Sequence, residues 1–178
     1  MFHVAGLDAA VSALAYDPVA RRFPWRNAWS LTALGHDGLK WTMLGVWAVC
    51  VAWKPLRRGA LLMAAAALAV TLLKQSSPYS CPWDLVQWGG AAEAPGPGRC
   101  LPAGHPVNGF MLFGLYFALR HERPRAARAV LIAAWVVGLI AGTVQVARGA
   151  HFVSHVLWTA WVAWAVTLAA DALTPRRA

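Results

Sequence analysis

Long apolar runs separated by short connections dominate the sequence and constrain its fold more than any other feature. Five runs read as membrane-spanning helices, at residues 39–53, 59–73, 107–119, 129–147 and 152–173. Several are shorter than the ~20 residues that a ~30 Å hydrocarbon core requires, so the helices are expected to extend into flanking residues. The pattern predicts an all-α, integral-membrane helical bundle with about five transmembrane helices.

The composition supports a membrane protein and argues against a nucleic-acid binder. Of the 178 residues, 59% are hydrophobic and 13% are charged, which is far from the balance of a soluble domain. The formal net charge is +9, but the basic residues lie between apolar runs and not on a polar surface of the kind that binds nucleic acid. The basic excess therefore suits membrane topology, anionic lipid or a phosphorylated substrate.

Basic residues are concentrated in alternate connections and at the C-terminus. Nine of the sixteen Lys and Arg residues fall there: Lys54, Arg57, Arg58, Arg120, Arg123, Arg125, Arg128, Arg176 and Arg177. The positive-inside bias places them on the cytoplasmic side. Lys74, the long loop 75–105 and the corner 148–151 then face the periplasm or exterior. We therefore expect a multi-pass protein of a bacterial-type inner (plasma) membrane.

The first thirty residues are read as an interfacial segment ahead of a transmembrane core at residues 39–173. Residues 1–17 are apolar but interrupted by Asp8 and Asp17, which favours an interfacial helix over a span. Residues 21–29 interleave aromatic and basic side chains, as a headgroup-level segment or an ordinary loop would. No cleavable signal peptide and no internal repeat are evident. We expect a single domain, 1–178.

Five ionisable residues from three separate places in the sequence are predicted to gather at one membrane face: Asp84, His105, Arg148, His151 and His155. Ionisable groups at this depth cost free energy unless they are paired or hydrated, so the cluster indicates a functional site. For any single histidine, an interfacial side chain without a chemical role is the alternative.

The spacing of His151 and His155 is the most informative part of this cluster. The two rings share one face if the last helix begins near residue 150. In a nucleophilic histidine, one ring nitrogen attacks phosphorus, and the other donates a hydrogen bond to an acceptor that fixes the tautomer. Zinc is the alternative, with His105 as a third ligand. A zincin, however, has Glu directly after the first histidine, where this chain has Phe152, so no metal is expected.

These residues resemble, in order and membrane placement, the motifs of the type 2 phosphatidic acid phosphatase superfamily. The matching positions are Lys74, Pro82, the segment Pro102-Ala103-Gly104-His105, Gly149, Ala150 and His151. The resemblance implies that His151 attacks phosphorus, that His105 protonates the leaving oxygen, and that water then cleaves the phosphohistidine without a metal or organic cofactor. It further implies that Lys74 and Arg148 neutralise phosphate oxygens. Gly104 is expected to leave backbone N–H groups open to an anion.

Four positions depart from the family's motifs. Cys81 and Gln145 stand where the motifs have arginine, Ala103 replaces a serine, and His155 replaces an aspartate. Arg148 lies one helical turn beyond Gln145 and is expected to restore the guanidinium. His155 can accept a hydrogen bond from His151 without adding negative charge, which predicts pH-sensitive activity. Asp84 is a candidate substitute carboxylate.

The three cysteines divide by location. Cys81 and Cys100 lie nineteen positions apart in the same predicted outer loop, whereas Cys50 lies inside a predicted span. In an oxidising compartment, the loop cysteines are predicted to form a disulfide with a loop-entropy contribution of roughly 3 kcal/mol. Two unpaired thiols are the alternative.

The expected function is that of a membrane lipid phosphatase. It would act on a lipid phosphomonoester or pyrophosphate at the outer face, with phosphatidate-type phospholipids, lipid A and polyprenyl phosphates as candidate substrates. The phosphate motifs do not choose among them, because chain selectivity depends on the shape of the groove. The alternatives are a catalytically degenerate lipid-binding protein and a lipid-to-lipid phosphotransferase.

Overall fold

The computed structural model describes residues 5–94 and 96–174, and the regular secondary structure of this part of the chain is helical, with two isolated β-bridges in its loops. Its α-helices are α1 (Ala5–Ala15), α2 (Trp29–Thr32), α3 (Leu39–Ala52), α4 (Arg57–Gln75), α5 (Val107–Phe110), α6 (Phe113–Leu119), α7 (Pro124–Ala147) and α8 (Val153–Leu173). A π-helix, η1 (Ala33–Gly38), joins α2 to α3, and short 3-10 turns lie at Lys54–Leu56, Pro82–Asp84 and Val86–Trp88. The all-α prediction is confirmed.

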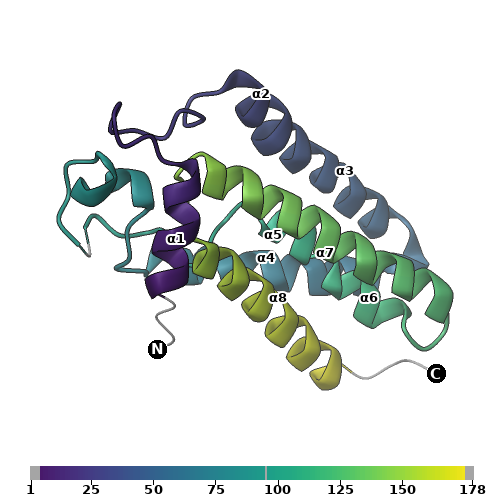
Figure 1. Cartoon of the computed structure of the whole chain (residues 1–178). Helices are drawn as coiled ribbons and strands as arrows, with labels where there is room; N and C mark the ends of the chain where they lie inside the picture. Colours follow the sequence, from purple (N-terminus) through teal and green to yellow (C-terminus); the bar gives the residue numbers. More distant parts are fainter. Residues whose placement is uncertain (1–4, 95, 175–178) are drawn as a thin grey trace.

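Three helical segments are long and apolar enough to cross a membrane: Lys54–Gln75, Pro124–Ala147 and Val153–Leu173. The predicted span at 39–53 is α3, which ends at Ala52 and continues backwards through η1 and α2 as one helical stretch from Trp29. The predicted spans at 59–73 and 129–147 also lengthen into their flanks, as the thickness of a bilayer led us to expect, whereas 152–173 begins one residue later, at Val153. In Figure 1 the long helices run side by side, with α3 along the outside.

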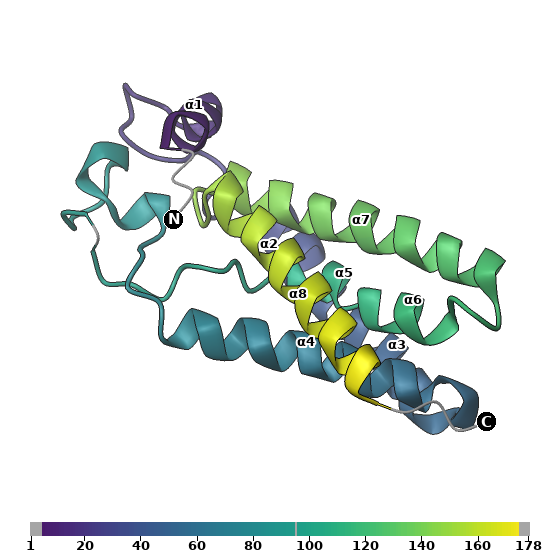
Figure 2. The ribbon, with the colours of Figure 1, turned by 90° about the horizontal axis from the view of Figure 1, so that it is seen from below.

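The predicted span at 107–119 is two short helices instead of one. Between α5 and α6, the amides of Leu112 and Gly114 bond to the carbonyls of Gly109 (3.1 Å) and Met111 (2.9 Å), three residues back instead of four. Such bonds tighten the backbone into a 3-10 turn, which interrupts the α-helix. Figure 2 shows the two pieces as separate ribbons beside α7.

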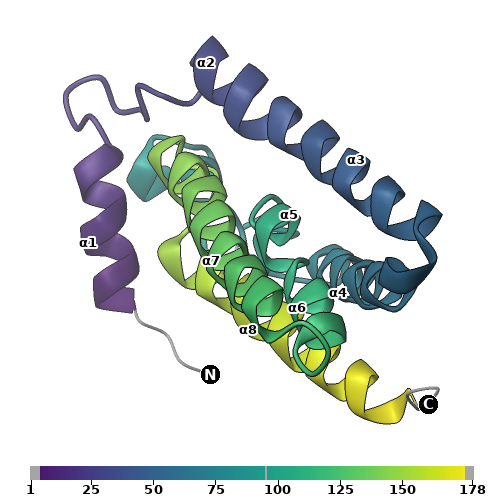
Figure 3. The ribbon, with the colours of Figure 1, turned by 90° about the vertical axis from the view of Figure 1, so that its right-hand side faces the viewer.

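Close helix contacts hold the bundle together. α4 packs against α6 and α8, and α7 packs against α5 and α6. Glycine permits the closest approaches: a Cβ on Gly109 would lie 2.1 Å from the Gly138 nitrogen, and a Cβ on Gly114 would lie 2.4 Å from the Met63 nitrogen. Small residues at helix contacts are typical of membrane bundles. Figure 3 shows α1 and α3 outside this core, on either side of α7.

The two ends of the bundle differ in chemistry. The C-terminal ends of α4 and α7 and the N-terminal ends of α5 and α8 meet at one end, together with α1 and the loop 76–106 (Figures 1 and 2). The basic connections at 53–57 and 120–123 lie at the other end. Arg176 and Arg177 lie outside the described residues. Every predicted site residue therefore belongs to the end opposite these basic connections.

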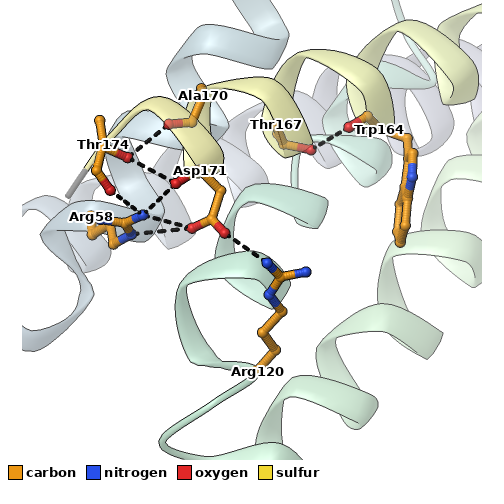
Figure 4. A network of polar contacts seen from close by, with 7 residues as sticks. All are labelled: Arg58, Arg120, Trp164, Thr167, Ala170, Asp171 and Thr174. Carbon is orange, nitrogen blue, oxygen red and sulfur yellow. Dashed lines mark hydrogen bonds and ion pairs between the residues drawn. The ribbon is translucent and has the colours of Figure 1, made fainter. Parts of the chain in front are cut away.

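A carboxylate joins three helices at the basic end. Asp171, in the last turn of α8, has a side chain only 2% exposed. Its Oδ1 accepts from Arg58 Nη2 of α4 (2.7 Å), and its Oδ2 accepts from Arg120 Nη2 at the end of α6 (3.0 Å). Figure 4 shows both guanidinium groups converging on this carboxylate. Asp171 thus pairs with two positive charges where the helices approach each other.

In the predicted interfacial segment, the described residues 5–28 form a helix followed by a loop. α1 ends at Ala15 and packs against α7 and α8, while residues 1–4 lie outside the described residues. Its polar residues face inward and its apolar residues outward, since Asp8 is 8% and Ser12 is 1% exposed, against 45% for Leu7 and 88% for Leu14. This inverted pattern fits a helix that lies at a lipid boundary.

Candidate active site

A disulfide shapes the loop that covers the site end. Cys81 and Cys100 are bonded, with Cα atoms 5.3 Å apart, which confirms the predicted pairing, and Cys50 is a buried free cysteine. The Cys100 N–H donates to the Tyr79 carbonyl (2.9 Å), which ties this strand of the loop to the residues just after α4. The loop is therefore crosslinked close to both of its helices.

His151 lies in the corner between α7 and α8, ahead of the last helix. α8 begins at Val153 and not near residue 150, so His151 and His155 do not share a helical face as expected. Gly149 turns the chain with φ +71°, and a Cβ there would lie 2.2 Å from the ring of Phe23. The two imidazoles still come together, with ring centroids 5.8 Å apart.

Cys100 is the direct neighbour of the His151 ring. His151 is 6% exposed, and its Nδ1 lies 3.1 Å from Cys100 Sγ. Burial lowers the pKa of His151 well below its ordinary value, and the positive charges of His155, Lys74 and His105 lower it further. A hydrogen bond with the Cys100 backbone raises the same pKa, but it does not outweigh burial. His151 is therefore held neutral, as a nucleophile requires.

Gly104 brings the second histidine segment against the end of α4. A Cβ at Gly104 would lie 3.7 Å from Lys74 Nζ, so the glycine leaves the half-buried ammonium room beside the backbone. His105 follows directly, and its carbonyl accepts from Asn108 Nδ2 (3.0 Å). Its charge also acts on His151. The structure therefore brings Lys74, His105 and His151 into one region.

Backbone hydrogen bonds fasten the same segment to α8. The Ala103 N–H donates to the His155 carbonyl (3.1 Å), and Thr159 Oγ1 donates to the Ala103 carbonyl (2.7 Å). Ala103 and Thr159 are fully buried. The segment that carries His105 is thus fastened to the first turns of α8, and His151 lies directly ahead of the same helix.

Arg148 and Gln145 lie at the end of α7. Arg148 donates from Nε to the Arg26 carbonyl (3.2 Å) and from Nη1 to Gln145 Oε1 (3.4 Å). Burial lowers the pKa of Arg148, and the charge of Asp37 acts in the opposite direction. Gln145 is buried, and its Nε2 finds no hydrogen-bond acceptor among the described residues. Arg148 therefore contacts the N-terminal segment, and its phosphate role stays a prediction.

Asp84 lies apart from the histidines. It ends the turn Pro82–Asp84 and lines a surface hollow together with Arg26, Trp83 and Glu93. No hydrogen bond joins Asp84 to His151 in the described part of the chain, and its role as a substitute carboxylate stays a prediction.

One trio in the described part of the chain has the spacing of metal ligands. Cys81, Cys100 and His151 offer atoms that all lie within 4.8 Å of one another. Both sulfurs are joined in the disulfide, however, and zinc binds cysteine as a thiolate. The trio therefore does not match a zinc site.

Asp8 and Phe23 are parts of the site end that the sequence reading missed. Asp8 accepts from the Ser154 N–H (2.9 Å) and from Ser154 Oγ (2.6 Å), which caps α8 from a different helix. Phe23 is 3% exposed and packs edge-on against Tyr16, and it also contacts Gly149. A carboxylate inside an apolar helix was the available signal for Asp8, whereas nothing in the sequence marked Phe23.

The fold and the candidate site together define a helical protein with candidate membrane spans and a histidine and lysine cluster at one end. The family model described as the PAP2 superfamily matches residues 55–177, and the chain belongs to that superfamily. This confirms the resemblance seen in the motifs, and membership implies phosphatase-type activity. The match covers α4 to α8 and with them Lys74, His105, His151 and His155. No curated protein and no solved structure matches the chain significantly.

Proposed function

We propose that this protein is a membrane lipid phosphatase in which His151 is the nucleophile and His105 the general acid. The observation that carries the proposal is the meeting of Lys74, His105 and His151 from three distant parts of the sequence: Lys74 Nζ lies beside Gly104, directly before His105, and the charges of Lys74 and His105 act on His151. Such convergence of a base-type nucleophile, an acid and a cation suits phosphoryl transfer. The reaction requires no metal or organic cofactor.

The first step forms a bond between a nitrogen of His151 and phosphorus while the bond from phosphorus to the lipid oxygen breaks. The ring edge that carries Nδ1 faces Cys100, which leaves Nε2 for the attack. His105 gives its proton to the departing oxygen. Water then attacks the phosphohistidine and releases phosphate, with His105 taking a proton from that water.

Cations and amides beside the histidines stabilise the charge on phosphorus. Lys74 is the first of these cations, since a Cβ on Gly104, directly before His105, would lie 3.7 Å from its Nζ. The buried Nε2 of Gln145 is a further donor, and Arg148 completes the set by a movement of its side chain away from Arg26. Donors fixed in advance at such positions contribute most to the transition state.

A nearby apolar hollow supports a lipid as the substrate. It has a volume of about 340 Å³ and is lined by Lys40, Leu44, Trp47, Ala64, Ala67, Asn108 and Met111. Asn108 also donates to the His105 carbonyl, so the hollow reaches the catalytic region. We propose that it holds an acyl or prenyl chain of a phosphatidate-type lipid, a lipid A or a polyprenyl phosphate.

We further propose five transmembrane passes, formed by α3, α4, the pair α5 and α6, α7, and α8, with α1 at the membrane surface. The site would then face the periplasm or exterior of a bacterial-type inner membrane. The basic connections at the opposite end support this orientation, as does the disulfide, because such bonds persist in oxidising compartments.

Phosphate release by the purified protein tests the function, with dioctanoyl phosphatidate, lipid A and a polyprenyl pyrophosphate as substrates. Removal of a nucleophile or a general acid costs on the order of 10²-fold or more in rate, so His151→Ala and His105→Ala are expected to lose nearly all release. His121→Ala, at an exposed turn of the basic end, is the matched control.

Three other outcomes would contradict the proposal. Equal silence of the wild type and His151→Ala on every lipid would favour a degenerate lipid-binding protein. Turnover that depends on an added lipid acceptor would instead identify a lipid-to-lipid phosphotransferase. Full release by His151→Ala would exclude this residue as the nucleophile.

A further inference from the structure

Two sulfurs and an imidazole nitrogen meet on the Nδ1 side of the proposed nucleophile. Ligand atoms of Cys81, Cys100 and His151 all lie within 4.8 Å of one another, and Cys100 Sγ lies 3.1 Å from His151 Nδ1. Three ligands of one zinc ion lie roughly 3.5–3.8 Å apart at the usual Zn–S and Zn–N bond lengths. Small movements would therefore bring this trio to zinc distances, and the bond between the sulfurs is what prevents it.

Main-chain hydrogen bonds hold the ligand-bearing segments together independently of the disulfide. The Trp83 N–H, two residues after Cys81, donates to the Gly149 carbonyl (3.0 Å) in the corner that carries the nucleophile. The Cys100 N–H donates to the Tyr79 carbonyl (2.9 Å), two residues before the other cysteine. Breaking the bond between the sulfurs therefore leaves all three segments joined.

Reduction of the disulfide supplies the two missing ligands. A phosphine and water convert the disulfide to two thiols and a phosphine oxide, and a newly made chain carries the same thiols before oxidation. Zn²⁺ displaces the two thiol protons, because zinc binds cysteine as a thiolate. We propose that the reduced protein binds Zn²⁺ at Cys81, Cys100 and His151, with water in the fourth position.

The ligands and their surroundings suit zinc. Thiolate and imidazole favour Zn²⁺ over Mg²⁺ and Ca²⁺, which prefer oxygen ligands. The charges of Lys74 and His105 reach His151, but two thiolates neutralise the ion, so the complex as a whole is not repelled. Cys100 is fully buried, whereas Cys81 is half-buried and opens a path for the metal from the loop surface.

Zinc on Nδ1 would remove the lone pair that attacks phosphorus. A neutral imidazole has one nitrogen with a lone pair and one with a proton, so a histidine that binds metal through Nδ1 keeps its proton on Nε2. The disulfide sulfur carries no hydrogen and can only accept, which favours the proton on Nδ1 and the lone pair on Nε2. This blockade of His151 rests on the proposed function, whereas the metal site does not.

Metal uptake by the purified protein in detergent tests the site, with Zn²⁺ and Co²⁺ as the probes and a phosphine as the reductant. The reduced wild type is expected to bind an equimolar amount of Zn²⁺ and, with Co²⁺, to show the absorption of a cobalt–thiolate bond. The oxidised wild type, reduced Cys81→Ser and reduced His151→Ala should bind at least tenfold more weakly, since even outer partners of zinc ligands are worth about tenfold. Cys50→Ala and His121→Ala, which lie outside the trio, are the matched controls.

Thermal unfolding separates binding by the folded protein from binding by an unfolded chain. A ligand stabilises only the state that binds it, so Zn²⁺ should raise the melting temperature of the reduced wild type but not that of reduced His151→Ala. No metal uptake by the reduced wild type, or an equal affinity in reduced His151→Ala, would overturn the inference. An equal rise in melting temperature for both proteins would do the same.

Phosphate release distinguishes this inference from the phosphatase proposal. Zn²⁺ is expected to lower kcat of the reduced wild type at least tenfold, and a chelator should restore the value of the reduced, metal-free protein. The oxidised wild type should be unaffected. Uptake at the trio with an unchanged kcat would overturn the blockade of the nucleophile. Uptake by a wild type that releases no phosphate from any lipid would overturn only the phosphatase proposal.

Discussion

At the scale of single residues, the group beside His151 Nδ1 is a disulfide sulfur. Cys100 Sγ lies 3.1 Å from that nitrogen, and the bond to Cys81 holds the sulfur in place. The sequence predicted Lys74, His105, His151 and the disulfide, because each depends on residue type and spacing. It could not predict the contact between Cys100 and His151, because the two residues are 51 positions apart and no motif links them.

The charge at position 155 should control the pH dependence of activity. After burial, the positive charge of His155 is the largest cause that lowers the pKa of His151. His155→Asp replaces it with a negative charge, which raises the pKa of His151, so the nucleophile becomes protonated at a higher pH. The acidic limb of kcat/KM against pH should therefore move upward relative to the wild type.

His155→Asn is the control for this experiment, because it removes the positive charge without adding a negative one. It should shift the limb in the same direction by a smaller amount. All variants are assayed with the same substrate, so the ionisation of the substrate affects every pH profile equally. An unmoved or lowered limb in His155→Asp would refute the assignment of His151 as the titrating nucleophile.

The disulfide should affect turnover more than substrate binding. Cys81→Ser frees the Cys100 strand, so the His151 ring loses its fixed orientation, and kcat is expected to fall about tenfold or more with a smaller change in KM. Unfolding should also become easier by up to roughly 3 kcal/mol. Cys50→Ala, in α3, leaves the disulfide intact and serves as the control in the same kinetic assay. A full kcat in Cys81→Ser would show that the bond has no positioning role.

At the scale of elements, the sequence located the helices well and their ends less well. Hydrophobic runs identified α3, α4, α7 and α8, and the structure lengthens most of them into their flanks. It divides 107–119 at a 3-10 turn and starts α8 at Val153, one residue after the predicted start of the span and beyond the position near 150 that would have put His151 on the helix. Both differences come from local backbone hydrogen bonds, which apolar periodicity does not report.

The cap on α8 comes from another helix, so its loss should be measurable. No side chain of α8's own N-terminal residue caps it, and Asp8 of α1 accepts from Ser154 instead. Asp8→Ala should lower the free energy of unfolding by about 1 kcal/mol. Thermal unfolding in detergent measures this, with Glu122→Ala at an exposed turn as the control. A melting temperature of Asp8→Ala equal to that of the wild type would show that the contact contributes nothing to stability.

At the scale of the whole molecule, the candidate site and the buried ion pairs of Asp171 lie at opposite ends of the bundle. The histidines and lysine gather at one end, and Asp171 pairs with Arg58 and Arg120 at the other (Figure 4). Charge patterning anticipated that the basic connections and the site would separate. It did not anticipate the ion pairs, because Asp171 and its partners are 113 and 51 positions apart.

Asp171→Asn should therefore destabilise the protein without changing its chemistry. It leaves two guanidinium groups without their carboxylate, and because both are partly exposed, the loss should be about 2–3 kcal/mol, below the ~3–5 kcal/mol of a fully buried pair. Denaturation in detergent measures the loss, and kcat below the melting range should match the wild type. Glu122→Gln is the control. A large fall in kcat would contradict the separation of the two ends.

The crosslinked loop also bears on how a cell handles errors of insertion. The bond between Cys81 and Cys100 closes only where oxidants reach both thiols. A chain threaded through the bilayer upside down would keep every histidine yet leave these thiols reduced in the cytosol. Under the mechanism proposed here, such a misinserted copy would be a poor catalyst, and lipids of the wrong leaflet would be spared.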